Sequence, residues 1–146
     1  ILLVDHRNAR LWLPPGGHLE PNEDPVQGAT REAFEESGLE VEVIAPPDLL
    51  AVDSPAVVPP PAVILIEDIV RPDQPFHQHI DHVYFTRSLH QVDFAHPIPH
   101  GPSHWFTAEE LAESFSLPAP DGTLVPVAED VRLLGLRALI AAQQEP

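Results

Sequence analysis

The sequence contains no cysteine, methionine or lysine, and each absence narrows the functions that the chain can have. Without cysteine the chain cannot form disulfides or thiolate metal sites, and this fits a reducing compartment, for which we expect the cytoplasm. Because methionine is absent and the chain opens on the apolar run 1–4, we expect that an N-terminal segment, possibly a whole strand, is missing. No apolar run approaches the roughly 18 residues of a transmembrane span, and no signal peptide is visible.

Positive charge is also scarce. The seven basic residues are all arginine and face 23 acidic residues, so the formal net charge is -16. Such a surface repels nucleic-acid backbones and anionic membranes, so we expect a small-molecule ligand and neither of these two partners. If that ligand is an anion, a bound divalent cation is the obvious way to offset its repulsion by the negatively charged surface. For most of the acids, we expect solubility to be the whole role.

The length of 146 residues and a hydrophobic content of 43% predict one globular domain over residues 1–146. Hydrophobic periodicity and turn residues indicate mixed α/β structure with one helix early, several strands and further helices late. The strands are predicted at 1–4, 11–13, 41–45, 62–70, 80–89 and 104–107, and the helices at 25–37, directly after Thr107, and at 127–143.

The helix at 25–37 has unusually clear end signals. Asp24 is a good N-cap, Pro25 suits the first helical position, and Gln27 completes a capping box with Asp24. Gly38 suits the left-handed residue that follows a helix. The face expected to pack against a sheet consists of Val26, Ala29, Thr30, Ala33 and Phe34.

Three carboxylates crowd the last part of this helix. Glu32, Glu35 and Glu36 fall within a sector of about 100° when 100° is allowed per residue. Their mutual repulsion costs a few tenths of a kcal/mol per pair, and their position opposes the helix dipole, although Arg31 can pair with Glu35. A hard cation such as Mg²⁺ would remove this repulsion. On its own, such a cluster is more often a solvated acidic face than a ligand site.

The surroundings of the cluster are more specific than the cluster itself. Residues 17–39 fit the pattern G-x5-E-x7-R-E-U-x-E-E-x-G-U, in which U is a bulky aliphatic residue and only Ala33 is smaller than expected. At average residue frequencies, a chance match at one window is of order one in a billion. This segment resembles the signature of the Nudix hydrolases, and most of the chain resembles the family, with the proline-rich stretch 46–61 doing so least. The fixed positions are Gly17, Glu23, Arg31, Glu32, Glu35, Glu36 and Gly38.

The resemblance implies a Nudix fold, in which a mixed sheet is sandwiched between helices. It also implies a hydrolase acting on phosphoric anhydride bonds. Such an enzyme cleaves the diphosphate linkage of a nucleoside diphosphate joined to a group X, with Mg²⁺ or Mn²⁺ and a metal-activated water. One alternative is a non-catalytic, nucleotide-binding regulatory Nudix domain, although such domains usually have eroded signatures. Another is an isopentenyl diphosphate isomerase, but those relatives use a catalytic cysteine. The fold often forms homodimers.

Carried over by position, the implied metal ligands are Glu32, Glu35 and Glu36 together with the carbonyl of Gly16. Arg31 is the implied orienting residue and pairs with Glu23, while Gly17 and Gly38 act through the backbone. Glu32 is our candidate for the general base, in a catalytic group with Glu35 and Arg31. The stretch before Trp105 contains no acid where relatives often carry one, and Asp93 is the nearest upstream alternative.

Histidine is concentrated late in the chain, with seven of nine between residues 77 and 104. On a strand, His77, His79 and Asp81 share one face and His82 takes the other. These histidines can be exposed polar residues, contacts to phosphate or base, or a transition-metal site, and the first is expected most often. His18 adjoins the loop glycines, so we predict that it binds substrate, and Trp12 is a second candidate that can stack on a nucleobase. The seven are His77, His79, His82, His90, His96, His100 and His104.

Overall fold

A computed structural model describes residues 1–6, 11–50, 52, 54–95, 98–99, 101–118 and 121–144. Two of the seven late histidines, His96 and His100, lie outside these ranges. In chain order the elements are β1 (Leu2–His6), β2 (Leu11–Leu13), α1 (Pro25–Ser37), β3 (Val41–Val43), β4 (Val63–Ile69), β5 (His77–Val83), β6 (Thr86–Ser88), β7 (Ser103–Trp105), α2 (Ala108–Ala112), β8 (Ser116–Pro118), β9 (Leu124–Pro126) and α3 (Glu129–Gln144). None of the helices in these ranges is long and apolar enough to cross a membrane.

The strands form one three-stranded sheet and three two-stranded ribbons. The sheet has the order β2-β1-β7, and the ribbons pair β3 with β6, β4 with β5 and β8 with β9. All of these pairs are antiparallel, while an isolated parallel bridge joins Trp12 to Val127. The predicted mixed α/β class is therefore confirmed, with antiparallel pairing dominant among the described strands.

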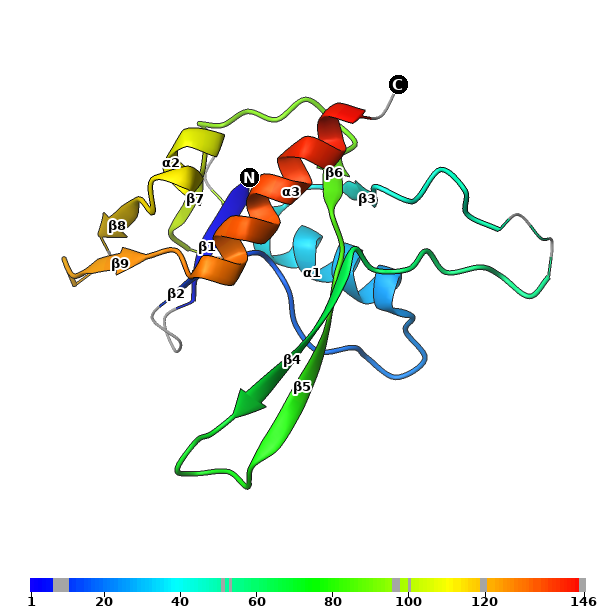
Figure 1. Ribbon diagram of the computed structural model, residues 1–146, viewed down its shortest axis with the longest axis horizontal. Helices are drawn as coiled ribbons and strands as arrows, with labels where there is room; N and C mark the ends of the chain where they lie inside the picture. The colour runs from blue at the N-terminus through cyan, green and yellow to red at the C-terminus, as the bar shows by residue number, and fades with distance from the viewer. Residues whose placement is uncertain are drawn as a thin grey trace.

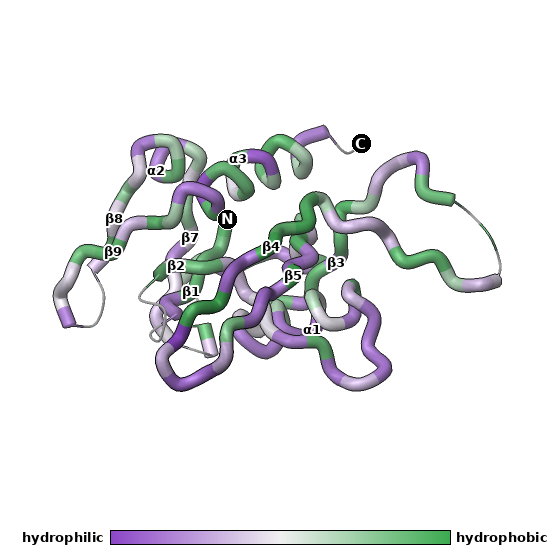
Figure 2. Tube along the Cα trace, turned by 60° about the horizontal axis from the view of Figure 1, so that its bottom comes forward, coloured by the Kyte–Doolittle hydropathy of each residue, from purple (hydrophilic) through white to green (hydrophobic). Residues whose placement is uncertain are grey.

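The helices lie on both sides of the central strands. Figure 2 shows α3 and α1 on opposite sides of β1 and β2, and Figure 1 shows the β4–β5 ribbon projecting away from them. The turn that joins β4 to β5 is hydrophilic (Figure 2). The core fills the space between β1, β2, β9, α2 and α3, because each of these elements turns an apolar side chain inward. Its buried members are Leu3, Trp12, Phe106, Leu111, Val125, Val127 and Val131.

The structure corrects some of the predicted elements. The strand predicted at 80–89 is divided, because β5 pairs with β4 whereas β6 pairs with β3. The hairpin of β8 and β9 was not predicted. The predicted packing face of α1 is wrong at Phe34, which is 53% exposed. The helix instead buries Gly28 and Ser37.

Candidate metal centre

The first turn of α1 is fixed by a capping box. One carboxylate oxygen of Asp24 accepts hydrogen bonds from the backbone N–H of Val26 at 2.9 Å and of Gln27 at 3.0 Å. The Gln27 side chain accepts from the backbone N–H of Asp24 at 2.9 Å. At the other end Gly38 has a φ of 72°, and its N–H donates to the carbonyl of Phe34 at 2.7 Å. The predicted caps are therefore confirmed, and they fix the direction in which the helix presents its glutamates.

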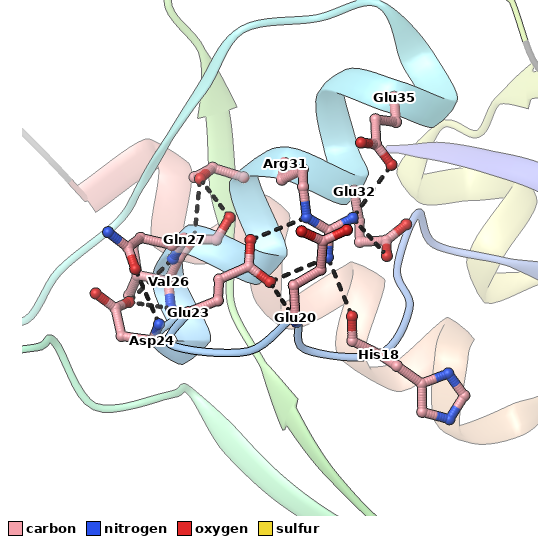
Figure 3. Close-up of polar contacts among 10 residues, drawn as sticks. His18, Glu20, Glu23, Asp24, Val26, Gln27, Arg31, Glu32 and Glu35 are labelled. Atoms are coloured by element: carbon pink, nitrogen blue, oxygen red, sulfur yellow. Dashed lines mark hydrogen bonds and ion pairs between the residues drawn. The ribbon is translucent and has the colours of Figure 1, made fainter.

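Arg31 lies at the centre of the polar contacts of this helix (Figure 3). Its guanidinium donates to both carboxylate oxygens of Glu23, at 2.9 and 3.1 Å. Its Nη1 donates to Glu32 at 2.9 Å and to Glu35 at 3.1 Å. Its Nη2 also donates to the carbonyl of His18 at 3.0 Å. The planar guanidinium therefore joins three glutamates of the signature to the preceding loop, as a bidentate arginine can.

The ion pair with Glu23 is well shielded, since the Arg31 and Glu23 side chains are 22% and 12% exposed. The hydrogen bond from Arg31 lowers the pKa of Glu23, and the bond from the backbone N–H of Glu20 adds to this effect. Conversely, the bonds to Glu23 and then Glu32 raise the pKa of Arg31. Both side chains therefore stay charged. The expected supporting pair of Arg31 and Glu23 is present as a contact.

The glycine loop closes tightly on the glutamate face of α1. A methyl group at Gly17 would lie 2.2 Å from a carboxylate oxygen of Glu32, so an alanine here would force that carboxylate to move. At the preceding residue, the N–H of Gly16 donates to Glu36 at 3.3 Å. Glu32 and Glu36 thus both contact the loop that carries the predicted carbonyl ligand.

The chemistry of this donor set fits a hard divalent cation. Carboxylate and carbonyl oxygens are the ligands that Mg²⁺ and Mn²⁺ prefer, and three like charges close together are relieved by a cation. Over the described ranges, no three His, Asp or Glu side chains are already arranged to hold a metal ion. Arg31 holds Glu32 and Glu35, and the Gly16 amide contacts Glu36. Binding an ion here would therefore require these side chains to turn toward a common point.

Known proteins resemble this chain over most of its length. Residues 1–128 match the NUDIX domain family. The chain belongs to the NUDIX family. A solved structure, "Crystal structure of a hydrolase, NUDIX family from Clostridium perfringens", superposes with a TM-score of 0.70 at 28% identity, covering 97% of this chain and 88% of that one. The predicted family and fold are confirmed, and the two matches support a pyrophosphohydrolase. Family members generally use divalent metal ions.

Two curated relatives match over a shorter stretch. The proteins named m7GpppN-mRNA hydrolase NUDT17 from Bos taurus and Homo sapiens are 58% identical over 31 residues and 59% identical over 29 residues. These segments are 21% and 20% of this chain, but only 10% and 9% of the relatives' own lengths. The match therefore concerns a short segment of each relative and not its whole length.

Trp12 is not available as the substrate contact that we predicted for this NUDIX domain. It is 3% exposed and lies in the core cluster. Its ring packs edge to face on Phe106, with centroids 6.4 Å apart. The alternation of residues along β2 did not determine which face of the strand Trp12 occupies. The pairing of β2 with β1 places Trp12 in the core.

The side chain of His18 points away from the Arg31 contacts in Figure 3. Its ring instead meets His79 of β5 edge to face, with centroids 5.3 Å apart. His18 and His79 are 61 positions apart in the sequence, and no local pattern predicts this contact. Whether His18 binds substrate stays a prediction, but its carbonyl and ring connect the NUDIX loop to both α1 and β5.

A small pocket beside the C-terminal end of α1 was also missed by the sequence analysis. It contains Asp93, whose carboxylate accepts from the N–H of Ala95 at 3.0 Å. Trp105 is another lining residue and packs edge to face on Phe94, with centroids 5.1 Å apart. The alternative base therefore lies near the end of the glutamate helix. The lining residues are Ser37, Gly38, Leu39, Val92, Asp93, Ile98, Pro99 and Trp105.

Proposed function

We propose that this protein hydrolyses a diphosphate linkage in a small nucleoside diphosphate derivative, with Mg²⁺ or Mn²⁺ as cofactor. The observation that carries the proposal is the joint approach of Glu32 and Glu36 to the Gly16–Gly17 loop. Glu32, Glu35, Glu36 and the Gly16 carbonyl would hold the ion. This follows from the oxygen chemistry of the residues and from the NUDIX family of the chain.

A bound divalent ion supplies Lewis acidity toward phosphate oxygens and lowers the pKa of bound water. The protein contributes position and proton transfer. Arg31 fixes the orientation of Glu23 and of the neighbouring glutamates through its four carboxylate hydrogen bonds. The Glu32 carboxylate, 16% exposed and pressed against Gly17, is the proposed acceptor of the proton from the attacking water.

The substrate class is narrowed by charge. The names of the two NUDT17 relatives suggest a capped mRNA end as one candidate substrate of this chain, although the match covers only about a fifth of the chain. A net charge of -16 opposes a long polyanion far more than a short one. We therefore propose a free nucleotide derivative as substrate, in a reducing compartment such as the cytoplasm.

The test is a panel of nucleoside triphosphates, sugar nucleotides and dinucleoside polyphosphates, assayed with Mg²⁺ and with Mn²⁺. The Glu35→Gln variant should lose at least about 100-fold in turnover, the upper part of the range for changes around a bound metal. Glu113→Gln, which changes an exposed acid at the end of α2, is the matched control and should keep its activity.

Calorimetry with non-hydrolysable nucleotides separates the enzyme from a regulatory nucleotide-binding domain. Nucleotide binding without any turnover on the panel would favour the regulatory alternative. Full activity of Glu35→Gln would contradict the ligand assignment itself.

A further inference from the structure

Three histidines lie together outside the candidate metal centre of Glu32, Glu35, Glu36 and Gly16, which is called the oxygen-lined centre below. The ring of His79 on β5 lies 5.3 Å from that of His18 and 5.2 Å from that of His77, measured between centroids. His18 belongs to the loop whose carbonyl is held by Arg31, while the other two belong to the β4–β5 ribbon. The fold therefore brings histidines from two distant segments into contact, which strand alternation alone would not do.

The face that carries these rings is acidic. His77, His79 and Asp81 alternate on the less exposed side of β5, and the register places Glu67 of β4 directly opposite His79. Neither β4 nor β5 contains an arginine or lysine. Imidazoles with carboxylates around them attract a cation and repel a phosphate, so the charges favour a metal ion over a second anion subsite.

One of the rings has a backbone hydrogen-bond partner of the kind that metal-binding histidines use. The Nδ1 of His77 lies 3.0 Å from the carbonyl oxygen of Pro75. A carbonyl can only accept, so Nδ1 is the donor in this contact. A backbone carbonyl that fixes the tautomer in this way is the usual partner behind a metal-binding histidine.

Two of the three ring spacings suit an ion shared by each pair, and an ion shared by all three rings also needs His18 and His77 to come equally close. A metal–nitrogen distance of about 2.1 Å puts the ring centre about 3.2 Å from the ion, so two rings at a tetrahedral angle have centres about 5 Å apart. Both observed separations, 5.2 and 5.3 Å, are close to this value. The nitrogens do not yet converge on one point within the described part of the chain, so ring rotations must accompany binding.

We propose that His18, His77 and His79 form a second cation site, for a borderline divalent transition ion such as Zn²⁺. Imidazole ligands suit Zn²⁺, whereas the glutamates of α1 suit Mg²⁺, so the two sites differ in metal preference. A bound ion would tie the loop of the oxygen-lined centre to the β4–β5 ribbon. Two-stranded ribbons are marginally stable alone, so this link would order the ribbon. The proposal does not depend on the hydrolase activity.

The test is calorimetry of the whole protein with Zn²⁺ in the presence of saturating Mg²⁺, together with the visible absorption spectrum of bound Co²⁺. The wild type should bind one Zn²⁺ beyond the Mg²⁺ site, and Co²⁺ should give tetrahedral bands. The double variant His77→Ala/His79→Ala and the single variant His18→Ala should each weaken binding by at least about tenfold.

The double variant His82→Ala/His90→Ala is the matched control. Both residues are exposed, and His82 lies on the opposite face of β5. This control should bind Zn²⁺ like the wild type, as should Glu35→Gln, which alters only the oxygen-lined centre. Circular dichroism checks that each variant is folded. Equal losses in the two double variants, loss in Glu35→Gln, or no stoichiometric Zn²⁺ binding would each overturn the proposal.

Discussion

Arg31 donates to both carboxylate oxygens of Glu23, through Nε at 2.9 Å and Nη2 at 3.1 Å. The same side chain reaches Glu32 and Glu35 from α1 and the carbonyl of His18 from the loop. Glu23 thus binds the guanidinium through Nε and Nη2, while Glu32 and Glu35 accept from Nη1. The geometry of the candidate centre therefore depends on a residue that need not touch the metal.

Arg31→Lys should keep the positive charge and lose the fork-shaped set of hydrogen bonds. We expect turnover to fall by about 10- to 100-fold, as for other partners of metal ligands. Steady-state kinetics on the best substrate of the panel measures this. Arg87→Lys is the control, because its pair with Glu42 is about half exposed on both sides and should matter little. Equal losses in the two variants would refute the positioning role.

Gly17→Ala should displace the Glu32 carboxylate, since the added methyl group would lie 2.2 Å from its nearest oxygen. We expect at least a tenfold loss of turnover and weaker activation by Mg²⁺, because the loop and the glutamate cannot keep their approach. Titrating Mg²⁺ in the activity assay, beside a thermal unfolding curve, separates a local effect from loss of the fold. Unchanged activation by Mg²⁺ would show that the close approach has no role.

Glu110 should make the free energy of unfolding depend on pH in the acidic range. Its pKa is lowered, first by the hydrogen bond from the backbone N–H of Thr107 and further by His104. A carboxyl with a lowered pKa in the folded state stabilises the protein above its unfolded pKa of about 4.3, and this contribution is lost as the pH falls through the folded value. Urea unfolding at pH 7 and pH 3 should therefore show a smaller decrease for Glu110→Gln than for wild type.

The control for this pH experiment is Glu109→Gln, which changes the exposed neighbour of Glu110 in the same helical turn. It should follow the wild-type pH dependence. A Glu110→Gln variant that loses as much stability on acidification as wild type would contradict the assignment.

Local signals predicted the helix that carries the candidate centre. The helix bounds, the Asp24 cap, the Gln27 capping box and the Gly38 terminus all follow from interactions within four residues of one another. The glutamates are placed together by helical periodicity alone. The family signature in residues 17–39 likewise depends on a single continuous stretch, so its recognition needed no tertiary information.

Long-range pairing explains what the sequence did not predict. Trp12 is buried because β2 pairs with β1 and bridges to Val127, more than a hundred residues away. The contact of His18 with His79 likewise depends on how the loop meets the β4–β5 ribbon. The strand predicted at 80–89 is divided because its two parts have different partners. Strand propensity cannot predict these partners.

Glu32 and Glu35 share one nitrogen of Arg31, and this has a consequence for the order of events during maturation. The guanidinium acts as a stand-in counterion, so the glutamate helix need not wait for an inorganic ion before it forms. If the ion proposed above binds, the polypeptide can reach its final shape first and bind the ion later, while Arg31 keeps its pair with Glu23. Metal supply in the cell would then control when the protein becomes active and not whether it folds.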